Sequence, residues 1–145
     1  MPREIAIPVL VLLGFAAWTE LILIISVGVY RWFCILTGRA SIAEWRADGK
    51  QGAEWYQRAT RAHMNCIENL PVYGAIVLAL VVSGLRSQLI EWLSVTMLVA
   101  RVGQTTVHVA LPLTNVVVSF RFALFSVQLV CMVAMGTIIA TAMIG

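Results

Sequence analysis

The stretch RATRAHMNCIENLPVYGAIVLALVV, residues 58–82, decides the fold class of this chain. Its first half contains two arginines, a histidine, two asparagines and a glutamate, and its second half is apolar without a break. A helix over this range is about 37 Å long at about 1.5 Å per residue. That length crosses a hydrocarbon core of about 30 Å. The stretch therefore predicts a membrane helix whose polar half faces protein, a water-filled cleft or a polar ligand.

The whole chain has the composition of a membrane protein. Of its 145 residues, 61% are hydrophobic and 12% are charged, whereas a soluble domain has about 25% charged residues. Apolar segments longer than about 18 residues are typical of transmembrane helices. Four are expected, at about residues 5–36, 58–82, 89–111 and 115–144. The sequence predicts an all-α integral membrane protein, a single four-transmembrane-helix bundle over residues 1–145.

The basic residues predict how the bundle is oriented. They gather in and beside the one long loop, at residues 37–57: Arg31, Arg39, Arg46, Lys50 and Arg58. The connection at residues 83–88 carries Arg86 alone. By the positive-inside rule, the long loop is expected in the cytoplasm and both chain ends on the opposite side. The expected membrane is a bacterial inner membrane, or the endoplasmic reticulum if the chain is eukaryotic.

Composition also limits the partners and the targeting of the chain. The net charge of +3 comes without a cluster of basic residues, so no nucleic-acid partner is expected. Cys34, Cys66 and Cys131 have neither disulfide nor metal-site spacing and are expected to be buried thiols. The first apolar segment is expected to remain in the protein, because it is much longer than the 7–15 residues of a signal-peptide core.

Polar residues of the second helix form one stripe. Four of them lie within an arc of about 80° at about 100° per residue: Arg58, Arg61, Asn65 and Glu68. A charge near the bilayer centre costs about 2.5–3.5 kcal/mol, so the stripe cannot face lipid. One interpretation is an interhelical polar clamp, with Arg61 and Glu68 paired to groups on other helices; Arg58 would then reach the interface and Asn69 would bond a neighbouring helix. The other is a ligand site.

The third and fourth helices carry similar groups. On the third helix, Arg101, Gln104 and His108 share one face. A single histidine on such a face is more often a core residue, but three polar groups in register favour a site. On the fourth helix, one face carries Arg121, Phe125, Gln128 and Met132.

Together these groups predict the chemistry of a ligand and of an assembly. Arginines favour bidentate contact with carboxylates, and Glu68 suits an ammonium group. The complementary ligand is a small zwitterion with several carboxylates, a description that glutathione fits. Polar faces on three helices exceed what one small bundle can cover, so an oligomer is expected.

Two motifs resemble a known family. RAHMNCIENLP, residues 61–71, is similar to the second-helix signature of the membrane-associated proteins in eicosanoid and glutathione metabolism (MAPEG), which include microsomal glutathione transferase. The matching positions are Arg61, Asn65, Glu68 and Pro71. ARVGQTTVH, residues 100–108, resembles the third-helix motif at Arg101. The resemblance covers nearly the whole chain.

The resemblance implies a homotrimer that binds glutathione between adjacent subunits, without a metal. It assigns the thiolate-holding role to Arg121, and it implies these further glutathione contacts: Arg58, Arg61, Asn65, Glu68, Gln104, His108 and Phe125. The chain departs from the family's prostaglandin synthase at Met64, Gln104, His108, Phe122 and Phe125. A prostaglandin-specific isomerase is therefore not expected. Glu20, midway along the first helix, has no counterpart in the family pattern.

The expected activity is that of a membrane-bound glutathione transferase with possible peroxidase chemistry. A cation lowers the pKa of a thiol from about 8.5 and so raises the fraction of the nucleophilic thiolate. The acceptor is expected to be a lipophilic electrophile or lipid hydroperoxide that arrives from the bilayer. The alternative is a non-catalytic lipid-binding scaffold, as in the family's lipoxygenase-activating member. A channel is disfavoured, because no ring of charges resembles a filter.

Overall fold

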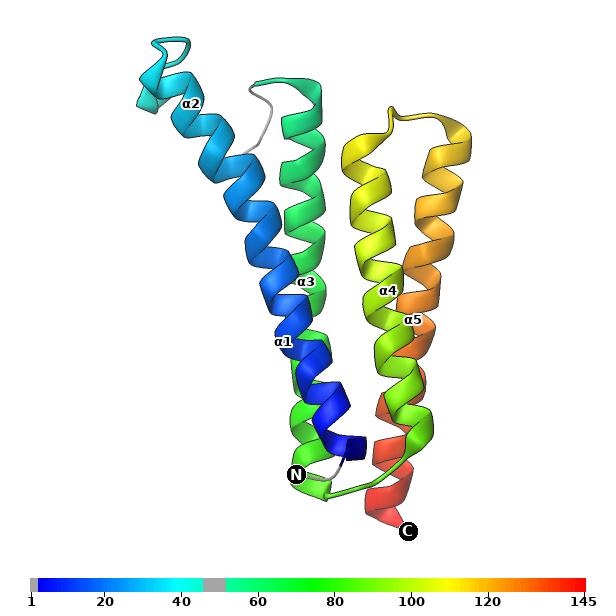
Figure 1. The fold of residues 1–145 in the computed structure, drawn as a ribbon. Coiled ribbons are helices and arrows are strands. Elements are labelled where there is room, and N and C mark those ends of the chain that lie inside the picture. Colours follow the sequence, from blue (N-terminus) through cyan, green and yellow to red (C-terminus); the bar gives the residue numbers. More distant parts are fainter. Residues whose placement is uncertain (1–2, 46–51) are drawn as a thin grey trace.

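The structure is a computed structural model that describes residues 3–45 and 52–145. These residues form four long helical rods joined by short connections (Figure 1). Their elements, in chain order, are α1 (Arg3–Leu23), the π-helical η1 (Ile24–Tyr30), α2 (Arg31–Leu36), the 3₁₀ turn η2 (Ile42–Glu44), α3 (Glu54–Ser83), α4 (Gln88–Ala110) and α5 (Asn115–Ile144). Arg46 and Lys50, which contribute to the orientation prediction, lie outside the described residues.

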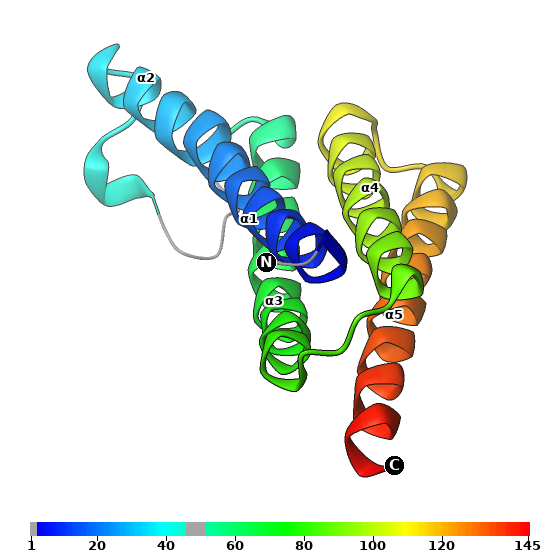
Figure 2. The same cartoon turned by 60° about the horizontal axis from the view of Figure 1, so that its bottom comes forward.

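The four rods run alternately up and down. Both chain ends lie at the same end of the bundle as the α3–α4 connection, and the α4–α5 turn lies at the other end beside the start of α3 (Figure 1). α1 packs against α3 and α4, while α4 packs against α5. The α2 end of the first rod leans away from the other helices in both ribbon views (Figures 1 and 2). This topology brings α3, α4 and α5 together around the polar residues of the sequence stripes.

Three helical segments among the described residues are long and apolar enough to cross a membrane. They are Glu4–Leu36, Glu54–Ser83 and Asn115–Ile144. The third expected span, α4, is not among them, because its polar residues reduce its apolar character. Its 23 residues still give a length of about 34 Å. That α4 also crosses the membrane therefore remains a prediction.

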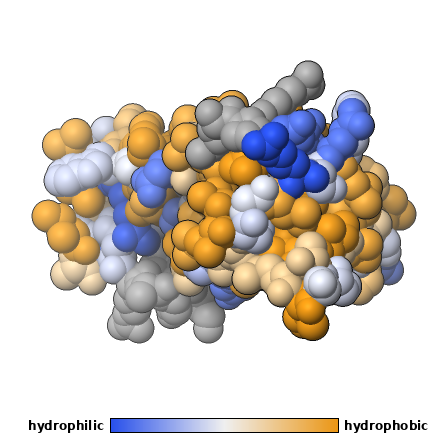
Figure 3. Space-filling view, turned by 90° about the horizontal axis from the view of Figure 1, so that it is seen from below, coloured by the Kyte–Doolittle hydropathy of each residue, from blue (hydrophilic) through white to orange (hydrophobic). Residues whose placement is uncertain are grey.

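The surface of the bundle is that of a protein in an apolar solvent. Large apolar side chains are exposed along every rod, such as Leu13, Leu78, Val99 and Val130. Seen from the end that carries both termini, apolar residues cover most of the surface and polar residues gather in patches (Figure 3). An exposed apolar surface of this extent is the surface that lipid covers in a membrane bundle.

The long loop is shorter than expected. α3 begins at Glu54 rather than near residue 58, and η2 forms a turn within the expected loop. Aromatic contacts explain the early start of α3. The Tyr30 hydroxyl accepts a hydrogen bond from the Ala53 backbone N–H at 2.9 Å, and the Tyr30 ring stacks on Tyr56 with 4.8 Å between centroids. Trp45 and Trp55 also pack on this cluster.

The other boundaries follow from local chemistry. α3 stops at Gly84, whose φ of 64° is left-handed, a conformation that glycine adopts without a steric cost. α5 starts where the Thr114 hydroxyl accepts the Val117 N–H at 3.3 Å, a helix N-cap. α5 has the same bounds as the segment expected from the sequence.

The core of the bundle is apolar and contains the free thiols. Phe15, Tyr73 and Met135 are completely buried between the helices. The Tyr73 hydroxyl donates to the Pro8 carbonyl at 3.2 Å and so ties α3 to α1. The three cysteines are buried and unpaired, as the sequence predicted.

Candidate functional site

A cavity of about 300 Å³ lies between α3, α4 and α5 and gathers much of the polar stripe. Five of its lining residues are predicted site residues: Asn65, Glu68, Gln104, Arg121 and Phe125. Its other lining residues are Asn69, Val118 and Phe122. Three helices thus place three amides, a carboxylate and a guanidinium around one space.

α3 supplies the carboxylate wall of this cavity. Asn65 and Glu68 are three residues apart and therefore lie on one helix face. The Asn69 side-chain amide donates to the Asn65 carbonyl at 3.0 Å. Asn69 thus bonds within α3, and the interhelical bond considered for it from the sequence is not formed among the described residues. The Glu68 side chain is exposed and forms no ion pair there.

Gln104 connects two walls of the cavity. Its Nε2 donates to the Arg121 backbone carbonyl at 3.2 Å, which links α4 to the first turns of α5. Its Oε1 accepts from Arg101 Nη1 and from Gln128 Nε2, each at 3.1 Å. The amide is therefore held from three sides, and its orientation is fixed before any ligand arrives.

Arg121 is the cation of the cavity. Its residue is half-buried on α5, and its Nε is buried without a hydrogen-bond partner among the described residues. A guanidinium has five N–H donors and no acceptor. Arg121 can therefore donate to an anion in the cavity without first breaking an ion pair of the described residues.

Arg101 lies behind the cavity rather than in it. It is 1% exposed and its guanidinium is 5.4 Å from the centre of the Phe15 ring, which gives a cation–π contact. Among the described residues its one side-chain acceptor is Gln104, and its Nε and Nη2 have no hydrogen-bond partner. The third-helix motif thus supports the site from within the core.

The two arginines at the start of the stripe line a separate cavity. This space of about 410 Å³ is lined by Glu54, Gln57, Arg58, Arg61, Pro112 and Leu113. Arg58 pairs with Glu54 at 3.8 Å and donates to the Val109 carbonyl at 3.2 Å. Arg61 is exposed, with no ion pair or hydrogen bond among the described residues. The stripe is therefore divided between two cavities.

His108 does not line either of these cavities. It lies on α4 and is 5% exposed, as expected for a core histidine. His63, which the sequence did not single out, is also buried, and its Nδ1 lies 3.2 Å from the Thr19 carbonyl of α1. The i,i+4 spacing of Asn65 and Asn69 is the signal that could have identified Asn69 as a lining residue.

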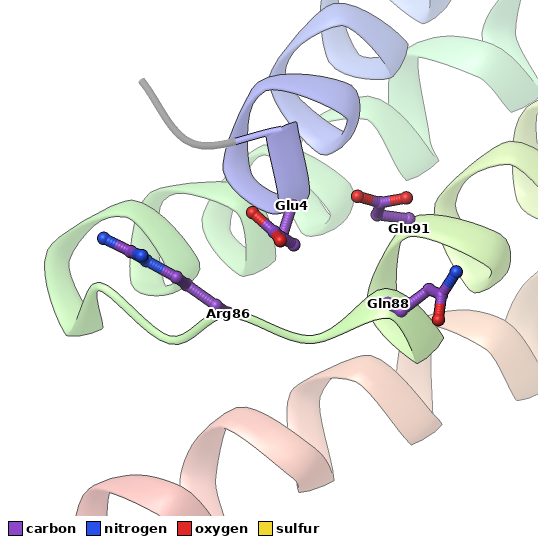
Figure 4. Close-up of a pocket in the computed structure, with 4 residues that line it drawn as sticks. All are labelled: Glu4, Arg86, Gln88 and Glu91. Atoms are coloured by element: carbon purple, nitrogen blue, oxygen red, sulfur yellow. The ribbon is translucent and has the colours of Figure 1, made fainter.

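A third polar cavity lies at the opposite end of the bundle. It has a volume of about 330 Å³ and is lined by Glu4, Arg86, Gln88 and Glu91. These residues come from the start of α1, the α3–α4 connection and the start of α4 (Figure 4). None of the predicted site residues lies in it. The cavity between α3, α4 and α5 is therefore the better candidate for the functional site.

The described residues hold no group of three or more histidine, cysteine, aspartate or glutamate side chains that could bind a metal ion. The cavity between α3, α4 and α5 instead offers amides, one carboxylate and one guanidinium. Such groups bind a polar organic ligand through hydrogen bonds and charge. The apolar Val118, Phe122 and Phe125 form the rest of its wall.

Comparison with known proteins gives the family of the chain. Neither a curated protein nor a solved structure matches it at a significant level. The family model of the MAPEG family matches residues 6–141. This range includes α3 and α4 whole, all but the outer ends of α1 and α5, and every residue of the cavity between α3, α4 and α5. The chain belongs to the MAPEG family, a membrane family of glutathione and eicosanoid metabolism.

Proposed function

We propose that this protein is a membrane-bound glutathione transferase that activates the glutathione thiol against lipophilic electrophiles, with peroxidase activity toward lipid hydroperoxides. The observation that carries this proposal is the cavity in which Glu68, Gln104 and Arg121 meet. A carboxylate, a fixed amide and a free guanidinium complement the ammonium, peptide and thiolate groups of glutathione. Membership of a glutathione-linked family supports the same ligand.

Each lining residue has a proposed role. Glu68 accepts hydrogen bonds from the glutathione ammonium, because charge-assisted bonds are the strong ones. Asn65 and Gln104 orient the peptide groups. Arg121 donates to the sulfur and stabilises the thiolate, since a nearby cation lowers the pKa of a thiol.

Arg58 and Arg61 have a secondary role in this proposal. They line the neighbouring cavity of about 410 Å³, and Arg61 is the one without an ion pair among the described residues. We assign Arg61 to a glutathione carboxylate that extends from one cavity into the other. Arg58 pairs with Glu54 and therefore contributes at most a longer-range electrostatic attraction to that carboxylate. His108 is assigned to packing of α4 rather than to contact with glutathione.

The volume of the site fits a small peptide. About 300 Å³ is at the lower end of the range of ligand pockets, roughly 300–1,000 Å³. The second cavity adds further space next to it. Phe122 is 69% exposed at the outer edge, so a lipophilic acceptor can reach the sulfur from the lipid side.

The proposed chemistry is nucleophilic attack by the bound thiolate. With an aryl halide, a carbon–sulfur bond forms and the halide leaves with the bonding electron pair. With a lipid hydroperoxide, the thiolate takes one peroxide oxygen and the lipid alcohol is released. A second glutathione then displaces water from the sulfenic acid, which yields glutathione disulfide. Both reactions use one activated thiol.

The competing proposal is a non-catalytic lipid-binding scaffold of the same family. The apolar wall of Val118, Phe122 and Phe125 favours it. Conjugation of glutathione to a generic aryl halide by the purified protein, measured with wild type and Arg121→Ala, separates the two. The enzyme predicts turnover that falls strongly in the variant. Glutathione binding without turnover of either an aryl halide or a hydroperoxide would instead establish the scaffold.

A further inference from the structure

Glu20 is an isolated charge on the outer face of α1. It is the one charged residue between Glu4 and Arg31. Its side chain is exposed, and exposed apolar residues such as Leu13 and Ile24 share its helix face. It forms no ion pair or hydrogen bond among the described residues. Because a carboxylate that faces hydrocarbon is costly, Glu20 requires a partner from outside its own bundle.

The contacts between helices give the depth of Glu20 in the bundle. The backbone carbonyl of its neighbour Thr19 accepts a hydrogen bond from Nδ1 of His63 on α3, at 3.2 Å. Arg61 is two residues from His63 along α3, an axial distance of about 3 Å at about 1.5 Å per residue. Glu20 and Arg61 therefore lie at nearly the same depth in the bundle.

The cation of the cavity lies close to this layer. Cys66 and Thr105 are in contact at 3.7 Å between α3 and α4, and the adjacent Gln104 bonds the Arg121 carbonyl at 3.2 Å. Arg121 is therefore level with Cys66, about one helical turn of 5.4 Å or less from His63. An acid on the outer face of α1 thus shares a layer with two basic residues of the candidate site.

Glu20 cannot complete the site of its own chain. α1 packs against α3 and α4, and no residue of α1 lines either cavity of the stripe. Arg61 is itself exposed and has no ion pair among the described residues. The exposed faces around both charges are apolar, with Leu13 and Ile24 on α1 and Met64 and Ile67 on α3.

We propose that Glu20 of one subunit forms an ion pair with Arg61 of the next subunit, so that α1 of a neighbouring copy covers the open side of the site. This inference rests on the proposed function only in naming that site. Charge complementarity selects a second copy as the occupant, since one chain carries both exposed partners at one depth. The two surfaces differ, so the contact is heterologous, the kind of contact that gives a ring where the rotation between copies closes.

The pair makes Glu20 a positioning residue. A guanidinium is planar, and its five N–H donors point outward along more than one edge of the group. One edge of Arg61 can hold Glu20 while another donates to a ligand carboxylate. The contact therefore fixes the direction of Arg61 at the boundary between the two cavities.

Cross-linking between two differently tagged chains in one membrane tests the contact. One chain carries Glu20→Cys and the other Arg61→Cys, and a short bismaleimide joins thiols that lie close together. We expect a covalent heterodimer that contains both tags. The matched control replaces Glu20→Cys by Leu10→Cys, which is also exposed on α1, at 63%. Leu10 lies about 15 Å further along the helix, so it should not cross-link.

A charge exchange provides a second measurement that does not depend on a thiol. Glu20→Arg and Arg61→Glu should each reduce the fraction of oligomer in native mass spectrometry, and the double variant should restore it. An intact oligomer that gives no Glu20–Arg61 cross-link, or a monomeric wild type, would overturn the proposal. The aryl-halide assay is independent of both measurements. Its failure alongside a clear cross-link would remove the proposed function and leave this contact standing.

Discussion

At the scale of single residues, Arg121 separates an enzyme from a binding protein. Replacing Arg121 by leucine should raise the pKa of bound glutathione toward the value of a free thiol, about 8.5. The thiolate absorbs in the near ultraviolet, so a difference spectrum across a pH titration measures this change. Because Arg121 lowers the pKa of the thiol, the wild type should keep the thiolate to a lower pH than the variant, which loses it as the pH falls through about 8.5. Turnover at neutral pH should therefore fall more than binding.

A matched arginine provides the control for this substitution. Arg58→Leu removes a cation that lines the other cavity and pairs with Glu54. It should leave the titration of the bound thiol nearly unchanged. Identical titration curves for wild type and Arg121→Leu would assign Arg121 to packing of α5 and pass the thiolate role to another cation.

Glu68 tests recognition rather than chemistry. Glu68→Gln keeps the size of the side chain and removes the charge proposed to meet the glutathione ammonium. A hydrogen bond to a charged group contributes about 1.5–3 kcal/mol, so the dissociation constant should rise by about tenfold or more. Calorimetry on the folded oligomer measures this dissociation constant.

Glu54→Gln is the control for this substitution. It makes the same change on the same helix outside the cavity and should have little effect on the dissociation constant. If the dissociation constant of glutathione is unchanged in Glu68→Gln, the role of Glu68 is structural.

The sequence predicted which residue types gather, but less well which of them face the ligand. Helical periodicity placed Asn65 and Glu68 on one face because spacing along one helix fixes their relative direction. Arg101, Gln104 and His108 share a face and are all buried, at 1%, 8% and 5% exposure, yet of the three only Gln104 lines the cavity. Which part of a polar face points to a cavity depends on how neighbouring helices pack. Periodicity within one helix contains no information on that packing.

At the scale of elements, Gln104 is the polar link between α4 and the first turns of α5. Gln104 is the acceptor for the buried Arg101 and also donates to the Arg121 carbonyl. Gln104→Leu removes these two bonds and the one that Gln128 donates, and it leaves a buried guanidinium without its oxygen partner. A lost bond to a charged group costs about 1.5–3 kcal/mol. The variant should therefore unfold at a Tm lower by several degrees in detergent without glutathione.

Gln104→Glu is the informative partner of that variant. It keeps the acceptor oxygen for Arg101 and adds a countercharge, while it loses the bond to the Arg121 carbonyl. Its loss of thermal stability, measured by circular dichroism, should be clearly smaller than that of Gln104→Leu. Equal losses in both variants would show that the bond to α5, rather than the pairing of Arg101, stabilises α4.

The elements themselves were largely readable from the sequence, with instructive differences at their ends. Its apolar character predicted the bounds of α5, and the structure adds that Thr114 caps its start. The early start of α3 was missed, because residues 54–57, EWYQ, lie outside the continuous apolar segment and the contacts between Tyr30 and Tyr56 that support them join distant segments. The π-helical stretch Ile24–Tyr30 was missed as well, since hydropathy does not distinguish it from an α-helix.

At the scale of the whole molecule, the path of α4 decides the topology. Arg58 of α3 bonds the Val109 carbonyl near one end of α4, and Glu4 of α1 and Glu91 of α4 line one cavity near the other end. α4 therefore extends along the same two helices as they cross the bilayer. We expect it to cross too, with its polar side chains covered by neighbours such as Gln128 of α5.

The positions of two labels distinguish four spans from three. With four spans and a cytoplasmic long loop, Ser41 and Leu113 face the cytoplasm and Gly145 lies on the opposite side. If α4 remained on one surface instead, Leu113 and Gly145 would exchange sides while Ser41 would not. A membrane-impermeant maleimide applied to intact cells should therefore label Gly145→Cys, but not Leu113→Cys or Ser41→Cys until the membrane is permeabilised. The native cysteines are buried and should contribute little background.

Labelling of Leu113→Cys in intact cells, with Gly145→Cys protected, would contradict a four-span bundle. Because the α4–α5 turn closes the cavity that contains Arg61, that result would also place the second arginine cavity on the wrong side of the membrane for the proposed site.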